Sequence, residues 1–300
     1  MAFAWRSSPR TTWARESWVS PDPQRDDALG AVFVGERGNT FWLVASAPWQ
    51  NDCRAFPGQP DARLSAQCVH RSFERELEEN TRASMVTLFA EADRSLGAFL
   101  RQSAPARLAS EPRLYEYACA VSAAVVRLHD WGLEYAILQD AGMVVRAPAM
   151  RDGRVFEDPR PMVFRDVFLQ AQARRLLRAQ GFSDPEFLRH LQAMRELERK
   201  TRNTPNGYPA LVGDERITRK VLRERLRVPM RDLELVLVSP GAARAWDVFQ
   251  MPLRKLFTDG LSDWAQELRR RESSDDQGRW FPRESRHDDI GILRIRVLTA

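Results

Sequence analysis

The order of the apolar segments predicts an α+β protein of one domain, with antiparallel sheets stacked between layers of helices. Segments with strand character and segments with helical periodicity follow one another in blocks along the 300 residues. Strands come first, followed by helices, strands, helices and strands again. This order fits neither the βαβ alternation of parallel sheets nor the many short strands of all-β folds. An architecture in which helices cover the outer faces of stacked antiparallel sheets accounts for every one of these segments.

The first block is a predicted β-hairpin. Apolar runs at residues 31–34 and 41–45 surround residues 35–39, which contain two glycines and an asparagine and predict a turn. The residues before the hairpin carry Ser, Pro, Asp and Arg without periodicity. We therefore expect an N-terminal extension over residues 1–25 and a single domain over residues 26–300.

Helices are predicted after the hairpin. Apolar residues recur at helical spacing over three segments, residues 64–73, 85–100 and 114–128. Gly132 is suited to the C-cap of the third helix. Strand character returns on both sides of a turn, at residues 135–138 and 143–145.

The second half of the chain repeats the alternation of blocks. Helical periodicity over residues 168–197 is interrupted at residues 181–185, where Ser183 or Asp184 can cap a helix that has Pro185 in its first turn. Residues 201–208 are polar and rich in turn formers, and predict a flexible loop. The remaining predictions are strands at residues 233–238 and 290–297, a helix at residues 261–271 and a charged loop at residues 272–286.

Arginine dominates the positive charge. The formal net charge is +5, and the lysines are limited to Lys200, Lys220 and Lys255. Many arginines lie three or four residues from an acid, as in residues 71–78 and 195–199, which is typical of solvated pairs on a helix surface. This pattern favours ordinary surface pairing over nucleic-acid binding.

The sequence gives no sign of a membrane or secretory segment. The longest uncharged apolar stretch, residues 117–126, is far shorter than the roughly 20 residues that a spanning helix needs. The cysteines Cys53, Cys68 and Cys119 are far apart and include no CxxC, which suits neither a disulfide framework nor a zinc site. We therefore expect a protein of the reducing cytoplasm that has no contact with a membrane.

Five short polar segments adjoin predicted strands. Asp26 and Asp27 precede the first strand, Ser46 ends the second, and Asp140 lies in a turn between two strands. A late strand runs into Ser239, Pro240 and Gly241, and Asp288 and Asp289 precede the last strand. In order and layout these segments resemble the motifs of the metal-dependent protein phosphatases, the PPM or type 2C family, in a divergent form similar to its bacterial members.

The resemblance implies an α-β-β-α sandwich with a binuclear Mn²⁺ or Mg²⁺ centre at one edge and phosphoserine or phosphothreonine as substrate. It places Asp27, Asp140 and Asp288 at metal-ligating positions, with Asp26 and Asp289 adjacent. Two other positions that carry metal-ligating aspartates in the family hold Ser46 and Pro240 here. A hydroxyl is a poor ligand and proline has no side-chain oxygen, while two dications need several carboxylates. We expect at most one ion.

Three further residues are weaker candidates for the site. His287 adjoins Asp288 and can orient it or transfer a proton. Arg25 corresponds by resemblance to a phosphate-binding arginine, although a surface role explains it equally well. Asp259 lies in a Thr-Asp-Gly sequence. Its letters resemble the Ser-Asp-Gly motif of the family, in whose place this chain has Ser-Pro-Gly at residues 239–241. The segment before Asp259, however, lacks strand character.

The sequence thus supports two functions of different class. The first is a pseudophosphatase that is impaired in catalysis and acts by binding a protein partner, such as a phosphoprotein or a kinase, in a regulatory role. The alternative is an active metal-dependent serine/threonine phosphatase with an atypical metal set built from Asp27, Asp140, Asp288 and Asp259.

Overall fold

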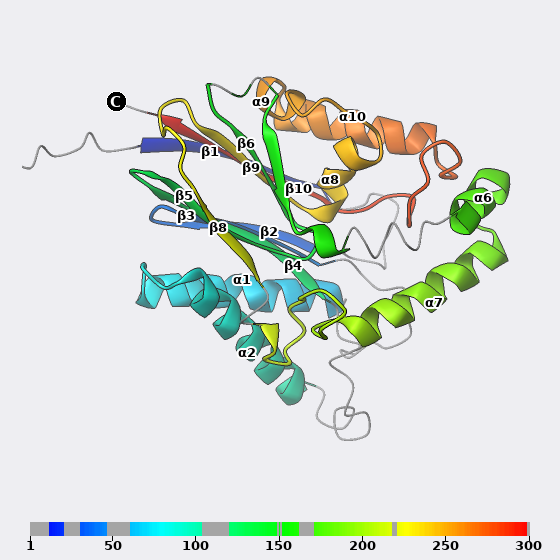
Figure 1. Ribbon diagram of the computed structural model, residues 1–300, viewed down its shortest axis with the longest axis horizontal. Coiled ribbons are helices and arrows are strands. Elements are labelled where there is room, and N and C mark those ends of the chain that lie inside the picture. Colours follow the sequence, from blue (N-terminus) through cyan, green and yellow to red (C-terminus); the bar gives the residue numbers. More distant parts are fainter. Residues whose placement is uncertain are drawn as a thin grey trace, which may run out of the picture.

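The computed structural model describes residues 12–20, 31–46, 61–103, 120–148, 150, 152–161, 171–217 and 221–298. Two five-stranded sheets lie face to face between helices (Figure 1). All paired strands are antiparallel. The predicted α+β class with two stacked antiparallel sheets is therefore confirmed. Within the described ranges no helix is both long and apolar enough to cross a membrane.

The two sheets have different strand orders. Sheet A runs in the order β1 (Thr12–Ser20), β10 (Ile290–Leu298), β9 (Glu234–Val238), β6 (Gly142–Arg146) and β7 (Arg154–Glu157). Sheet B runs in the order β2 (Ala31–Arg37), β3 (Thr40–Ser46), β4 (Val121–His129), β5 (Gly132–Leu138) and β8 (Leu222–Leu226). The chain passes from sheet B to sheet A between β5 and β6, so the strand–turn–strand segment predicted there joins the two layers.

Both faces of the central strands are buried. In β9, Leu235 and Leu237 pack between the sheets, whereas Val236 and Val238 pack against the helices outside sheet A. In β4, Ala124 and Val126 face the space between the sheets, and Val125 faces the helices outside sheet B. Alternate side chains of one strand thus belong to different apolar cores.

Helices cover the outer face of each sheet (Figure 1). The helices α1 (Asp61–Glu79) and α2 (Met85–Ser103) pack on sheet B through a core that includes Trp42, Phe73 and Phe89. Three helices pack on sheet A, namely α8 (Pro240–Asp247), α9 (Lys255–Thr258) and α10 (Leu261–Ser274). The helices α6 (Ala171–Gln180) and α7 (Pro185–Thr201) share a smaller apolar cluster.

One predicted helix is wrong. Within the segment 114–128, residues 121–129 form strand β4, and Gly132 begins β5 at φ 141° instead of capping a helix. Residues 121–128 are buried on both faces, so the segment shows no polar alternation. Periodicity alone does not distinguish a buried strand from a buried helix segment. Residues 114–119 lie outside the described residues.

Strand β1 lies in the segment that was expected to be an N-terminal extension. It pairs with β10 along its whole length, from Thr12 opposite Leu298 to Ser20 opposite Ile290. Residues 14–17 of this edge strand are exposed, which explains why the sequence shows little apolar signal there. The edge strand β8 was not predicted for the same reason, because residues 223–225 are exposed. Strand β7, which has only four residues, was not predicted either.

The other predicted elements are close to the observed ones. The β2–β3 hairpin, α1, α2, α10, β9 and β10 are present, and Asp184 caps α7 by accepting a hydrogen bond from Phe187 N at 2.7 Å. In the predicted loop 201–208, the buried Asn203 donates to Ala210 O at 3.0 Å and accepts from Ala210 N at 2.9 Å. These bonds anchor the loop to the strand-like segment that follows it.

Asp93 of α2 holds a second loop against the helical layer. Its carboxylate is buried and accepts hydrogen bonds from the backbone nitrogens of Val212, Gly213 and Glu215 at 2.7–3.1 Å. Burial raises the pKa of Asp93 to about 6, although these three donors oppose the shift. The loop lies so close that a Cβ on Gly97 would be 2.4 Å from Gly213 O.

We predict that Asp93→Ala lowers the free energy of unfolding by about 3 kcal/mol, because three backbone donors lose their buried acceptor. Urea unfolding at pH 8, where the carboxylate is ionised, measures the change. Glu79→Ala, at the exposed end of α1, is the control and should alter stability by no more than about 0.5 kcal/mol. Equal losses of unfolding free energy in Asp93→Ala and Glu79→Ala would contradict this prediction.

Candidate functional site

The strand ends of both sheets meet at one edge of the sandwich. In sheet B, Ser46 is paired with Ala31 and Val121. In sheet A, Val238 is paired with Gly142 and Ile292. These residues are the ends or near-ends of their strands. The turn before β6, the residues after β9 and the residues before β10 therefore lie at the same end of sheet A.

A close contact between the sheets brings these two ends together. Gly291 of β10 lies so near β2 that a Cβ on it would be 2.1 Å from Val32 Cγ1, and Ser239 N donates to Gly291 O at 2.9 Å. We call this end of the sandwich the strand-end edge. It contains Ser46, Asp140, Pro240, Asp288 and Asp289. The other predicted site residues, Arg25, Asp26 and Asp27, lie outside the described residues.

Neither of the altered positions offers an available oxygen ligand. Ser46 is buried, and its hydroxyl donates to Ala120 O at 3.0 Å. Pro240 is the first residue of α8, whose N-cap Ser239 accepts from Ala242 N at 3.3 Å. The Ser239 hydroxyl also bonds Asp289 O and Gly291 N, both at 2.9 Å. This segment therefore joins β9 to α8 and fixes the start of β10.

The Asp288 carboxylate is paired with an arginine of the same chain. Arg244 Nη2 of α8 lies 3.2 Å from Asp288 Oδ2, and Asp288 Oδ1 accepts from Asp289 N at 2.9 Å. Arg269 of α10 donates to the backbone oxygen of Asp288 at 2.6 Å. Two guanidinium groups thus adjoin the residue that matches a metal ligand.

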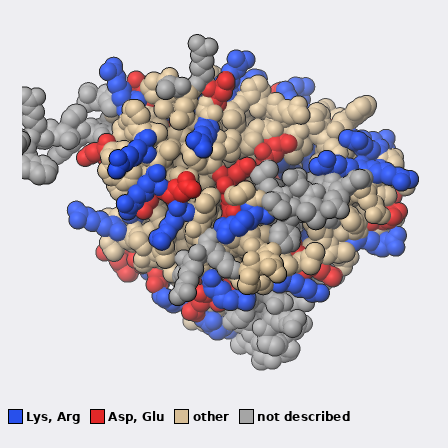
Figure 2. Space-filling model, viewed as in Figure 1, with Lys and Arg blue, Asp and Glu red and all other residues tan. Residues whose placement is uncertain are grey.

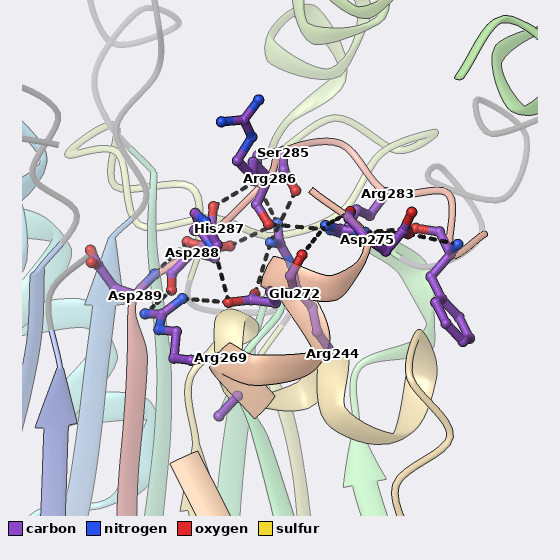
Figure 3. A network of polar contacts seen from close by, with 12 residues as sticks. Arg244, Arg269, Glu272, Asp275, Arg283, Ser285, Arg286, His287, Asp288 and Asp289 are labelled. Atoms are coloured by element: carbon purple, nitrogen blue, oxygen red, sulfur yellow. Dashed lines mark hydrogen bonds and ion pairs between the residues drawn. The ribbon is translucent and has the colours of Figure 1, made fainter. Parts of the chain in front are cut away.

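Glu272 is the centre of this polar network (Figure 3). Its side chain is 0% exposed, and three cationic or ionisable groups surround it. Arg269 Nη1 lies 2.6 Å and His287 Nδ1 3.1 Å from Glu272 Oε2, and Arg244 Nη1 lies 3.7 Å from Oε1. Burial raises the pKa of Glu272, but the bond from His287 and the charges of the two arginines outweigh it and lower the pKa below its usual value.

A second ion pair holds the loop between α10 and β10. Arg283 Nη1 lies 2.9 Å from Asp275 Oδ2, and both side chains are almost fully buried. Arg283 also donates to the backbone oxygens of Glu272 and Asp275, at 3.2 and 2.7 Å. Asp275 accepts from the backbone nitrogens of residues 279–281. The predicted charged loop is therefore tied to the C-terminus of α10.

The sequence analysis missed Glu272 and Arg244 as residues of the site. A signal for Glu272 was present, because it follows Leu261, Trp264, Ala265 and Leu268 on the buried face of α10. An acid at such a position needs buried partners. Nothing in the sequence indicated which arginines these partners would be.

Asp140 has different neighbours from Asp288. It lies near Glu198 of α7 and Tyr208, whose hydroxyl donates to Glu198 Oε1. Burial raises the pKa of Glu198, and the carboxylates of Glu284 and Asp140 add to this effect against the opposing charge of Arg202. Asp140 thus lies near a partly buried group of acids, whereas Asp288 belongs to the arginine network.

Gln139 precedes Asp140 in a strained backbone conformation. Its φ is 60°, a region that favours glycine, the residue that the phosphatase motif has at this place. Its side chain is 6% exposed, and no described residue donates a hydrogen bond to Oε1. Such a buried acceptor without a described donor is uncommon in folded proteins.

The remaining candidates are His287 and Asp259. His287 is buried and its Nδ1 contacts Glu272, so among the described contacts it serves the network rather than the Asp288 carboxylate. Asp259 is the C-cap of α9, 3.8 Å from Lys255 Nζ, and its backbone oxygen accepts from Arg294 at 2.9 Å. Arg294 is in the middle of β10, so Asp259 adjoins a different part of that strand than Asp288 does.

The described residues do not fit a two-metal centre. No group of three or more His, Cys, Asp or Glu side chains among them is arranged to hold a metal ion. The Ser46 hydroxyl already bonds a carbonyl, Pro240 has no donor atom, and Asp288 pairs with a guanidinium. Two dications held side by side need anionic oxygens to offset their charge.

Comparisons with known proteins support the fold. No family profile matches the sequence, and no curated protein sequence matches it. The structure resembles a Streptococcus agalactiae serine/threonine phosphatase, with a TM-score of 0.55, 10% identity, and 96% of this chain and 100% of that chain covered. It also resembles the catalytic domain of the phosphatase PstP in complex with two manganese ions, with a TM-score of 0.53, 13% identity and coverage of 96% and 99%.

A third similar structure is PppA, described as a key regulatory component of the type VI secretion system in Pseudomonas aeruginosa. Its TM-score is 0.51 at 12% identity, with 95% of this chain and 98% of that chain covered. The resemblance to the PPM-type phosphatase fold that the sequence motifs indicated is therefore confirmed over nearly the whole chain. At these identities the likeness establishes the fold.

We predict that Glu272→Gln destabilises the protein by about 3–5 kcal/mol near pH 7, because it leaves buried guanidinium groups without their carboxylate. The lowered pKa of Glu272 also implies that wild-type stability is fully present above pH 4.5, the usual value, and is lost as the pH falls through the folded-state pKa. The variant lacks this part of the pH dependence.

Thermal or urea unfolding between pH 3 and pH 7 measures both effects. Asp263→Asn, an exposed acid in the first turn of α10, is the control and should retain the wild-type pH profile. A Glu272→Gln profile parallel to that of the wild type would contradict the assignment.

Proposed function

From the phosphatase fold and the altered strand-end edge, we propose that this chain is a pseudophosphatase that binds a protein partner without efficient hydrolysis of phosphoesters. The observation that supports this most directly is the ion pair between Arg244 and Asp288, at 3.2 Å. A positive group of the chain itself thus contacts the carboxylate to which the resemblance assigns a metal ion. Ser46 and Pro240 supply no compensating carboxylate.

Charge balance explains why this arrangement disfavours metal-dependent hydrolysis. Binuclear phosphatase chemistry needs two dications that lower the pKa of a bridging water and hold the phosphoryl oxygens. Arg244 and Arg269 already neutralise Glu272, and Arg244 also contacts Asp288. A cation that binds Asp288 must displace or tolerate this guanidinium, while no fixed carboxylate at Ser46 or Pro240 assists it.

A regulatory role through binding is in keeping with this edge. The arginine network holds α8, α10 and the start of β10 together without a metal ion, so the fold can present a defined surface to a partner. We propose a protein partner, either a phosphoprotein or a kinase. The fold alone does not determine function, since proteins of the same fold carry different functional sites. A regulatory role has a parallel in one structural neighbour, PppA, which is described as a regulatory component.

Hydrolysis of a phosphoserine peptide in the presence of Mn²⁺ tests the proposal. We expect the wild type to release phosphate no faster than Asp288→Ala, because Asp288 does not support a two-metal clamp. Mn²⁺-dependent turnover by the wild type that Asp288→Ala abolishes would instead establish the alternative function, an active serine/threonine phosphatase with an atypical metal set.

We also predict that a carboxylate at position 240 strengthens metal binding. Pro240 begins α8, where an acidic side chain is well tolerated, and the next residue, Gly241, is close enough that a Cβ on it would be 3.1 Å from Asp288 Cβ. Isothermal titration with Mn²⁺ should show tighter binding to Pro240→Asp than to the wild type.

Pro240→Asn is the matched control, because asparagine has nearly the same shape as aspartate but carries no charge. It should bind Mn²⁺ as weakly as the wild type. If Pro240→Asp binds no better than Pro240→Asn, the lost carboxylate at this position does not limit metal binding.

A further inference from the structure

A groove of about 450 Å³ runs along the outer surface of the α1–α2 layer. Its polar lining comes from one face of each helix: Gln67, Arg71, Ser72 and Arg75 of α1, and Ser95 and Gln102 of α2. We call it the α1–α2 groove. Its volume lies within the range of small-ligand sites, about 300–1,000 Å³. The helices that form it cover sheet B, whereas the Glu272 network adjoins sheet A (Figures 1 and 3).

The groove carries positive charge from two arginines of α1. Arg71 and Arg75, one helical turn apart, are exposed, and the described residues that line the groove include no Asp or Glu. Neither guanidinium forms an ion pair with a carboxylate among the described residues. Some other exposed arginines form such pairs, including Arg94 with Glu91 and Arg270 with Glu267, whereas others, such as Arg63, do not. On the face shown in Figure 2, basic and acidic side chains are interspersed.

Hydroxyl groups lie beside these arginines. Arg75 Nη2 donates to Ser95 Oγ at 3.0 Å, and Ser95 Oγ is 3.2 Å from Ser72 Oγ. Ser72 is 3% exposed, so its hydroxyl is fixed in the floor of the groove. Two guanidinium groups and two hydroxyls thus offer more hydrogen-bond donors than one carboxylate can use. A phosphate monoester has three acceptor oxygens and about two negative charges, and matches this set of donors better.

The other part of the groove is apolar. Leu64, Cys68 and Phe99 are partly buried and pack against the core beneath sheet B. Burial raises the pKa of the Cys68 thiol to about 11, although Arg75 and Arg71 oppose the shift, so the thiol stays neutral at physiological pH. An anion-binding part and an apolar part therefore adjoin within one groove.

We propose that the α1–α2 groove binds a phosphorylated serine or threonine within a segment of a partner protein. The phosphate lies between Arg71 and Arg75 and accepts hydrogen bonds from the Ser72 and Ser95 hydroxyls. An apolar residue next to the phosphoresidue packs on Leu64 and Phe99. Recognition of phosphate by paired arginines is an established mode of peptide binding. The groove is separate from the strand-end edge, so this binding does not depend on whether that edge hydrolyses phosphate.

Fluorescence polarisation with the full chain tests the proposal. The probe is a labelled mixture of nine-residue peptides with a central phosphoserine and random flanks, and EDTA is present throughout so that metal-dependent binding or hydrolysis at the strand-end edge does not contribute. We expect the phosphorylated mixture to bind and the unphosphorylated mixture to bind at least about tenfold more weakly, since each charge-assisted contact is worth about a factor of ten.

Variants locate the binding site. Arg71→Gln combined with Arg75→Gln should weaken binding by at least about tenfold, and Arg71→Lys with Arg75→Lys should give an intermediate affinity, because lysine keeps the charge but loses the fork. Arg63→Gln removes one positive charge, half of that removed by the double variant, from an exposed position of α1 outside the groove, and should bind within about twofold of the wild type. Thermal unfolding verifies that each variant is folded.

Three results would overturn the proposal: equal binding of phosphorylated and unphosphorylated mixtures, equal binding of a mixture with glutamate in place of phosphoserine, or full binding by the Arg71→Gln/Arg75→Gln variant. The second would identify a general acidic-peptide surface. None of these results bears on the hydrolysis experiment, so the two proposals stand or fall separately.

Discussion

The strand-end edge depends on one buried carboxylate. Glu272 has no exposed side-chain surface, and Arg269, Arg244 and His287 surround it. These partners come from α10 itself, from α8 and from the residues before β10, so a single anion of α10 links this helix to two other segments. Removing one member of such a buried pair leaves another charge uncompensated, which is why the cost is large compared with that of an exposed pair.

This internal charge balance lies within a fold that the chain shares with serine/threonine phosphatases of known structure. The sandwich is that of the PPM-type phosphatases, with similar structures covered over nearly their whole length. In this chain the cations near Asp288 are guanidinium groups, which are planar, permanently charged and unable to activate a water as a metal ion does. At the described part of the strand-end edge, positive charge is therefore supplied by side chains of the protein itself.

The sequence was sufficient for the layers of the fold because its strongest signals are periodic. Apolar spacing defined α1, α2, α10, β9 and β10 correctly, but it failed where a strand is buried on both faces, as in β4, or exposed on an edge, as in β1. The motif order likewise brought Ser46, Asp140, Pro240 and Asp288 to one edge. It did not reveal the pairing of Arg244 with Asp288, since such a contact depends on how α8 and α10 pack in three dimensions.

The pairing of β1 with β10 places the two ends of the described chain side by side. Thr12 is opposite Leu298, at the end of sheet A remote from Ser20 and Ile290. A short linker can therefore join these ends with little loss of chain entropy, and new termini can be opened elsewhere, as in a circular permutant. By the same geometry, a linker that joins Thr12 to Leu298 lies away from the strand-end edge, which is at the Ser20 and Ile290 end of these strands.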